Sequence, residues 1–257
     1  MRNRIEDASI VLEWSEAPWD GTVIGAPAMQ LTHLEVRGPN PGVGMQAFES
    51  ERDRLAVSLI TCRLPHYRLI ESMFLEGRDF RFIEMLYRPE VDLCSAALED
   101  DMPPLLVMNA RKEDLPTLLD IAGNAFSNER FHMDPRLGSA LGNQRYRNWV
   151  ASSQTDPDQQ LIAVRDGERV VAMFIIEMLS ERICYWHLTA VAPAVQGQGY
   201  GQRVWRAMMR HALQFGATHV RTSVAARNYR VINLYGQLGF RFSAPAMTFH
   251  WLRKPDK

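Results

Sequence analysis

The sequence predicts an α/β fold of the α+β type, in which a mixed, mostly antiparallel sheet is flanked by helices. Apolar runs of strand length alternate with segments of helical spacing along the second half of the chain. Two long apolar runs meet at Asp166–Gly167, a pair that favours an antiparallel hairpin. A later strand leads through a glycine-rich loop and a helix into another strand, as in a parallel crossover. With 257 residues, 46% of them hydrophobic, the chain can bury one large core or two smaller ones.

An acidic, proline-bearing stretch near the middle of the chain predicts a connector between two folded units. It reads LEDDMPP over residues 98–104, and charge followed by two prolines suits an exposed linker. We place the boundary near residue 102. The smaller N-terminal domain is then expected over residues 1–102 and the larger C-terminal domain over residues 103–257.

The elements of the C-terminal domain follow from local patterns. A strand is expected over Leu105–Met108, followed by a helix that Asp114 caps and that carries Pro116 in its first turn. Helical spacing returns around Tyr146–Val150, and the hairpin through Asp166–Gly167 comes next. The remaining elements are a strand Ile183–Val191, a helix Gly201–Phe215, a strand His219–Val224, a helix Tyr229–Leu238 and a β stretch Arg241–Leu252.

Composition excludes several classes of protein. The formal net charge of -1 gives no electrostatic reason to expect nucleic acid or an anionic membrane as a partner. Glu6 and Asp7 interrupt the place where a signal peptide needs an apolar run, and no window approaches the roughly 18 apolar residues of a membrane span. The three cysteines lack a CxxC pair, which argues against a disulfide framework or a zinc site. We therefore expect a cytoplasmic protein without a metal and without membrane insertion.

Three glycines alternate in the stretch VAPAVQGQGYGQRVW, between an apolar run and an amphipathic one. A dinucleotide fingerprint that begins at Gly197 would need glycine where Gln202 stands, and a P-loop would need a Gly-Lys-Ser/Thr run. The segment from Gln196 to Gly201 fits Q-x-x-G-x-G at the start of a helix, where free N–H groups and the helix dipole favour an anion. A flexible turn is the alternative.

This loop and a later segment, Arg227–Phe240, resemble the GCN5-related N-acetyltransferase family. The later segment is similar to the family's N-x-x-A-x-x-x-Y-x-x-x-G-F pattern, with Ile232 close to the place of the small residue. The resemblance implies the fold of that family and acetyl-coenzyme A as cosubstrate. It implies transfer of the acetyl group to a primary amine.

The resemblance also assigns roles to residues of this sequence. Thr189, Ala190 and Val191 would pair with the pantetheine arm of the coenzyme, and Asn228 would hydrogen-bond to that arm. Tyr235 would protonate the departing thiolate, and its alternative is an ordinary core aromatic. The residues that would hold the pyrophosphate are Gln196, Gly197, Gln198, Gly199, Tyr200, Gly201 and Gln202.

The general base is not fixed by any motif. Glu177 and His187 on the strands of the second domain are candidates, as is Glu84 in the first. Glu84 lies within the apolar run RFIEMLY, where a carboxylate costs free energy unless it is paired or hydrated. That cost suggests function, although a salt bridge explains the position as well.

The first domain resembles a degenerate copy of the second. The segments Pro65–Gly77 and Arg227–Gly239 each lead into an F-R-F motif. Met73 stands where Tyr235 stands, and His66 replaces Asn228, so we expect the first domain to bind no coenzyme and to wall the substrate pocket. The identities are Tyr67 with Tyr229, Arg68 with Arg230, Ile70 with Ile232, and Gly77 with Gly239.

A partial copy followed by a complete one resembles the TDP-fucosamine acetyltransferase group. Leu12-Glu13-Trp14 and the loop Ala125–Pro135 match that group, whereas Trp19-Asp20-Gly21 departs from its two aromatics before glycine. The group N-acetylates a 4-amino-4,6-dideoxy sugar on a nucleotide, for surface polysaccharide. The resemblance implies a nucleotide-linked amino sugar as acceptor, with Tyr235 as proton donor and Glu84 near the site.

The polar loop after the first helix of the C-terminal domain is the candidate acceptor site. Arginine forks suit the phosphate oxygens of a nucleotide diphosphate, and a solvated surface loop is the alternative. Its candidate residues are Arg130, His132, Asp134 and Arg136. Acetylation of a protein N-terminus, a lysine or another small amine also remains open, as does a non-catalytic acetyl-coenzyme A sensor. We expect a homodimer, the commonest assembly of soluble enzymes.

Overall fold

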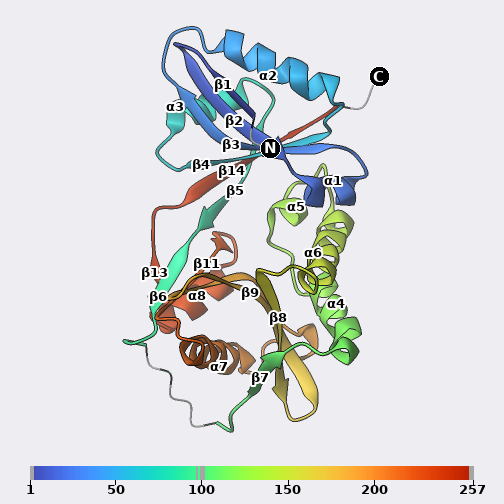
Figure 1. Ribbon diagram of the computed structural model, residues 1–257, viewed down its shortest axis with the longest axis vertical. Coiled ribbons are helices and arrows are strands. Elements are labelled where there is room, and N and C mark those ends of the chain that lie inside the picture. Colours follow the sequence, from blue (N-terminus) through green and yellow to red (C-terminus); the bar gives the residue numbers. More distant parts are fainter. Residues whose placement is uncertain (1–2, 97, 99–101, 255–257) are drawn as a thin grey trace. The chain divides into compact units, whose positions relative to one another are not determined.

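The computed structural model describes residues 3–96, 98 and 102–254, which form two compact units (Figure 1). Unit 1 comprises Met1–Leu86 with Ala244–Lys257, and unit 2 comprises Tyr87–Ser243. This division differs from the expected boundary near residue 102. Strand β6 (Pro89–Asp92) joins the sheet of unit 2, and the last strand, β14 (Ala246–Leu252), joins that of unit 1. Of the expected connector over residues 98–104, residues 99–101 lie outside the described residues.

Unit 1 is a sheet with three helices among its described residues. Within this unit its strands run in the order β1-β2-β3-β4-β14-β5, and β3 and β4 pair in parallel while the other ladders are antiparallel. One face packs in a core where the Trp14 and Phe48 rings lie 5.1 Å apart. The elements before β14 are β1 (Asn3–Glu6), β2 (Ile10–Glu16), α1 (Pro18–Ile24), β3 (Ala28–Val36), α2 (Gly42–Arg54), β4 (Leu59–Pro65), α3 (Leu69–Glu76) and β5 (Arg81–Tyr87).

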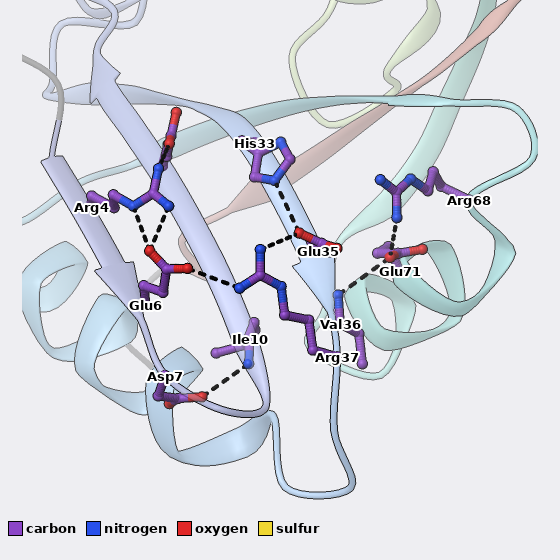
Figure 2. Close-up of polar contacts among 11 residues, drawn as sticks. Arg4, Glu6, Asp7, Ile10, His33, Glu35, Val36, Arg37, Arg68 and Glu71 are labelled. Carbon is purple, nitrogen blue, oxygen red and sulfur yellow. Dashed lines mark hydrogen bonds and ion pairs between the residues drawn. The ribbon is translucent and has the colours of Figure 1, made fainter.

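Ion pairs cover the outer strands of unit 1 (Figure 2). Arg37 contacts Glu6 and Glu35 at 2.8 Å each, and Arg4 contacts Glu6 at 2.5 Å. These side chains are largely exposed, so solvent screens the pairs and they add little to the free energy of unfolding.

Unit 2 is a second sheet, with strand order β13-β6-β11-β10-β9-β8-β7. Helices α4 and α6 pack on strands β8, β9 and β10, and α7 packs on β10 and β7. Its elements after β6 are β7 (Leu106–Asn109), α4 (Leu115–Asn124), α5 (Arg130–Met133), α6 (Ser139–Ser153), β8 (Gln159–Asp166), β9 (Arg169–Ser180), β10 (Ile183–Val191), α7 (Tyr200–Gln214), β11 (His219–Thr222), β12 (Val224–Ala225), α8 (Tyr229–Gln237) and β13 (Arg241–Phe242).

The order of elements in unit 2 confirms the expected mixed, mostly antiparallel sheet. The β8–β9 hairpin turns at Gly167, whose φ of +58° suits the predicted tight turn, and Gly216 follows α7 with φ +86°. The expected β stretch Arg241–Leu252 divides into β13 of unit 2 and β14 of unit 1. The expected capping role of Asp114 is wrong. Its side chain bonds to no N–H of α4. It accepts the Arg111 N–H at 2.9 Å and forms a buried ion pair with Arg165 of β8.

The two units share an order of elements, strand–helix–strand–helix. It is β3-α2-β4-α3 in unit 1 and β10-α7-β11-α8 in unit 2, where the two-residue strand β12 lies between β11 and α8. In each run a nine-residue strand pairs in parallel through its first four residues only, Ala28–Leu31 in β3 and Ile183–Trp186 in β10. The correspondence does not extend to every residue. Met73 is 72% exposed, whereas Tyr235 is 1% exposed, so Met73 does not hold the position of Tyr235 within its own unit.

Candidate functional site

The site in unit 2 is built where β10 and β11 separate. The parallel ladder ends at the pair Trp186 and Thr222, and β10 continues to Val191 with β9 as its partner on the other side. Among the described residues of unit 2, the segment Thr189–Val191 therefore has one edge without a strand partner. Backbone groups on such an edge need acceptors and donors from elsewhere, so this edge suits an extended ligand.

The glycine loop follows directly and presents its backbone outward. Gly197 and Gly199 have φ values of +77° and +82°, in the left-handed region that favours glycine. Gly199 is also the N-cap of α7. Both residues are exposed, and their N–H groups have no acceptor in the described part of the chain. Together with the free N–H groups in the first turn of α7, they form a set of exposed donors suited to an anion.

The polar side chains of the loop stabilise it from within. Gln196 donates to the carbonyl of Val191 at 3.0 Å, and Gln198 donates to the carbonyl of Ala194 at 3.1 Å. Gln202 contacts Gln237 of α8 at 2.8 Å. These contacts engage the glutamine side chains of the loop. The N–H groups of Gly197 and Gly199 remain exposed.

Tyr235 lies at the point where β10 and β11 separate. It is 1% exposed on α8, and its ring lies 4.6 Å from that of Phe240. Burial raises the pKa of Tyr235 above its ordinary value, and hydrogen bonding with Thr222, Trp205 and Thr189 opposes part of that rise. The hydroxyl is therefore a stable proton donor at neutral pH, beside the last paired residue of β11 and the free edge of β10.

Asn228 forms the N-cap of α8. Its side-chain oxygen accepts the Val231 N–H at 3.3 Å, which satisfies one of the free donors of the helix start. The sequence suggested a coenzyme contact for this residue. The structure gives Asn228 a structural role through its oxygen, and the coenzyme contact stays a prediction.

Glu177 and His187 form a hydrogen-bonded pair in the same unit. His187 Nε2 lies 2.7 Å from Glu177 Oε2, at a bulge in the pairing of β10 with β9. The Tyr185 ring lies 4.7 Å from the imidazole and the Trp149 ring lies 6.0 Å from it. The side chains of His187 and Glu177 are 20% and 27% exposed, so this pair is partly shielded and still accessible from the surface. Two candidates that the sequence offered separately are thus one dyad.

Glu84 lies in unit 1, on β5, and is 2% exposed. It pairs across the ladder with Thr248 of β14, and His250 follows two residues later on the same face. Thr248 and His250 are both fully buried. The sequence analysis missed His250, although the alternation of polar and aromatic residues in TFHWL places it on the Glu84 face.

The expected acceptor loop folds as α5 and the turn after it. Arg136 forms a two-pronged ion pair with the buried Asp134, with both N–O distances at 2.8 Å. The His132 ring packs on Gly142, where an added Cβ would lie 2.5 Å from it, and Nε2 contacts Asn143 at 2.8 Å. Arg130 is buried with its guanidinium 4.7 Å from the Phe131 ring centroid. These contacts give the loop a structural role, and its contact with an acceptor stays a prediction.

The equivalent place in unit 1 is closed by its own side chains. Glu71, 4% exposed, accepts the Val36 N–H at 3.3 Å at the end of β3 and pairs with Arg68 at 3.1 Å (Figure 2). Gly44 lies inside α2, and an added Cβ there would lie 2.5 Å from Ile10. Unit 1 therefore has a filled strand edge and a packed helix start where unit 2 has an open edge and an exposed loop.

The described residues contain no group of three or more histidine, cysteine, aspartate or glutamate side chains arranged to hold a metal ion. None of the helices in the described part of the chain has both the length and the apolarity to cross a membrane.

Comparisons with known proteins agree with this geometry. Residues 119–240 match the sequence model of the Acetyltransferase (GNAT) family. A mycothiol acetyltransferase from Corynebacterium efficiens is 28% identical over 114 residues, which is 44% of this chain and 38% of that protein. The chain thus spans well under half of the curated relative that it matches.

Solved structures share the fold across nearly the whole chain. The GCN5-related N-acetyltransferase from Sphaerobacter thermophilus has a TM-score of 0.65 at 12% identity, over 97% of this chain and 82% of that one. A tandem GNAT protein from the clavulanic acid biosynthesis pathway has a TM-score of 0.62 at 12% identity, over 97% and 80%. The fold is that of GNAT acetyltransferases. Together with the family match, it supports a GNAT-type acyltransferase.

Proposed function

We propose that this GNAT-type protein transfers the acetyl group of acetyl-coenzyme A to a primary amine. The observation that carries the proposal is the exposed loop with left-handed Gly197 and Gly199, set between the open edge of β10 and the start of α7. A pyrophosphate needs several N–H donors close together, and this loop offers exposed backbone donors next to a positive helix end. The β10 edge then takes the amide groups of the pantetheine arm.

The chemistry requires a proton donor for the sulfur. The amine nitrogen attacks the thioester carbonyl carbon, a C–N bond forms, and the C–S bond breaks. Tyr235 gives its hydroxyl proton to the departing thiolate and regains a proton from solvent. A phenol whose pKa is raised by burial is a weak acid, but it donates a hydrogen bond to sulfur as the charge develops.

The amine must also lose protons, and Glu84 is the first proposed base. Glu84 is 2% exposed in an apolar strand, where a carboxylate costs free energy unless it is paired or hydrated, and this cost is the reason for proposing it as the base. Its neighbours Thr248 and His250 supply polar groups on the same face of the sheet in unit 1.

A second candidate base is the dyad of His187 and Glu177, favoured by their 2.7 Å contact in the same unit as Tyr235. When Nε2–H donates to the carboxylate, Nδ1 carries the lone pair that accepts a proton from the amine. Among the described residues, His187 Nδ1 has no hydrogen-bond partner.

For the acceptor we propose a nucleotide-linked amino-deoxysugar, as in the TDP-fucosamine acetyltransferase group. Arg130 and Arg136, in and just after α5, are the side chains that we propose for the diphosphate, because an arginine fork matches phosphate oxygens. We place the protein in the cytoplasm, in keeping with three free cysteines, and expect it to act as a homodimer. A peptide N-terminus, a lysine and other small amines are the competing acceptors.

Release of free thiol from acetyl-coenzyme A tests the proposal directly. The assay is run with nucleotide-linked amino sugars, with the matching free amino sugars, and with a panel of peptides. Thiol release that depends on a nucleotide amino sugar supports the full proposal. Release with a peptide and with no sugar would show that the acceptor is a peptide amine instead. Coenzyme binding without release for any amine would point to the non-catalytic sensor.

A further inference from the structure

The first residue of α7 is tied to the turn of the β8–β9 hairpin. The Tyr200 hydroxyl donates to Oδ2 of Asp166 at 2.7 Å, and Asp166 is the last residue of β8. A hydrogen bond from a hydroxyl to a carboxylate is charge-assisted and stronger than a neutral one. The hydrogen bond to this carboxylate raises the pKa of Tyr200, so the hydroxyl remains a donor at neutral pH.

Arg203, in the first turn of α7, completes the contact. Its guanidinium lies 5.2 Å from the Tyr200 ring centroid, and its Nη1 lies 3.5 Å from Asp166 Oδ2. Its Nη2 donates to the carbonyl of Pro103 at 3.1 Å. Asp166 is 38% exposed, so solvent screens the ion pair, and the hydrogen bond from Tyr200 is the stronger link.

The glycine loop needs such a link. An added Cβ at Gly197 or Gly199 would meet nothing within 4 Å, so neighbouring side chains do not hold the loop at these positions. The hydrogen bonds of Gln196 and Gln198 return to the segment just before them. Tyr200 links the end of the loop to strand β8, and Gln202 in the first turn of α7 contacts Gln237 of α8. Ordering an unanchored loop on binding costs conformational entropy for each residue that must be fixed.

We propose that Tyr200 and Asp166 form an anchor that holds the glycine loop in its binding conformation and so sets the affinity for the diphosphate part of the coenzyme. This inference rests on the proposed function, because it takes the loop as the seat of the pyrophosphate. Arg203 offsets the charge of Asp166, so the acidic anchor does not repel a diphosphate. Tyr200 and Asp166 are thus positioning residues that act through the loop backbone.

Two ligands separate this role from a general effect on the fold. Acetyl-coenzyme A carries the pyrophosphate, whereas S-acetylpantetheine carries the same thioester without it. Calorimetry measures the Kd of both for the wild type, Tyr200→Phe, Asp166→Ala and the double variant. Tyr67→Phe, an exposed position in unit 1, is the matched control.

The anchor predicts a roughly threefold to tenfold rise in the Kd of acetyl-coenzyme A for each single variant, with the Kd of S-acetylpantetheine unchanged. The double variant should be no weaker than either single one, since both remove the same bond. An unchanged Kd for acetyl-coenzyme A in Tyr200→Phe, or an equal loss for both ligands, overturns the anchor.

If the wild type binds acetyl-coenzyme A and S-acetylpantetheine with the same Kd, the loop does not bind the pyrophosphate. That result contradicts the proposed function as well. If Tyr200→Phe does not fold, Asp166→Asn is compared with Asp166→Ala. The asparagine keeps an acceptor for the Tyr200 hydroxyl, so it should lose less affinity for acetyl-coenzyme A than the alanine. Equal losses in these two variants overturn the anchor.

Discussion

His187 Nε2 lies 2.7 Å from Glu177 Oε2, across the bulge where β10 pairs with β9. The carboxylate orients the imidazole, and the rings of Tyr185 and Trp149 pack near it, at 4.7 Å and 6.0 Å between ring centroids. The sequence offered the two residues as alternatives. Their contact makes them one unit, in which the carboxylate stabilises the imidazolium that forms when the ring takes a proton.

Substitution of His187 tests the dyad as a base. If the imidazole removes a proton from the amine, His187→Gln should lower kcat by roughly 10²–10⁴. Glu177→Gln should lower it less, because the imidazole remains. Part of each loss should be recovered at high pH, where more of the amine is already neutral. A folded His187→Gln enzyme with normal kcat across pH would exclude the dyad.

Substitution of Glu84 by glutamine, Glu84→Gln, tests this residue of unit 1 as the base. If Glu84 takes the proton of the amine, directly or through a water, the variant should also turn over slowly and recover at high pH. If Glu84 is a structural carboxylate, the variant should unfold at a lower temperature and keep a nearly normal kcat. Thermal melting and the pH–rate profile, measured on the same preparation, separate the two roles. A normal rate at every pH rejects Glu84 as the base.

Tyr235→Phe removes the proposed acid and retains the packing of the ring. We expect kcat to fall by roughly 10²–10⁴ while the KM for acetyl-coenzyme A changes little. Burial raises the pKa of Tyr235 above the ordinary value of about 10, so the phenol stays protonated through neutral and mildly alkaline pH. The wild-type kcat should therefore decline from loss of this proton only above about pH 10. Wild-type turnover in the folded variant, with chemistry rate-limiting, would contradict the role.

Thiol titration tests the burial of the cysteines. Burial raises the pKa of the Cys62 thiol to about 12 and that of Cys184 to about 11, whereas Cys94 is exposed. Only thiolates react quickly with a disulfide reagent. At mildly alkaline pH the native protein should show one reactive thiol per chain, Cys94, and all three should react in denaturant. Rapid reaction of a second thiol in the native protein would show that one of the two cores is open.

Much of unit 2 could be predicted because its signals are local. Hairpin residues at Asp166–Gly167, an uninterrupted strand at Ile183–Val191 and the glycine after α7 each act through neighbouring residues. The division into units was harder to predict. Strand β14 pairs with β4 and β5, far away in the sequence, and no local pattern identifies the sheet that a strand joins.

The candidate site shows the same contrast. The glycine loop could be found from its spacing together with the strand before it, the helix after it and the later segment Arg227–Phe240, since left-handed φ values at Gly197 and Gly199 favour glycine. The contacts of the residues around the loop could not be found from spacing. Tyr200 meets Asp166, and His250 lies on the face of Glu84, only because separate strands bring them together. Glu71 closes the strand edge of unit 1 through one side chain, which spacing does not reveal.

The central claim is that the backbone of the glycine loop in unit 2 binds the pyrophosphate of acetyl-coenzyme A. Calorimetric titration with acetyl-coenzyme A tests this claim most directly. The comparison uses the wild type, Gly199→Val and a matched control, Gly25→Val, which also has positive φ but lies in unit 1. We predict one site per chain in the wild type and the control. In Gly199→Val, the left-handed conformation is strained and the side chain blocks the anion, so affinity should fall tenfold or more, about 1.4 kcal/mol. Two sites per chain, or an unchanged affinity in a folded Gly199→Val protein, would contradict the account.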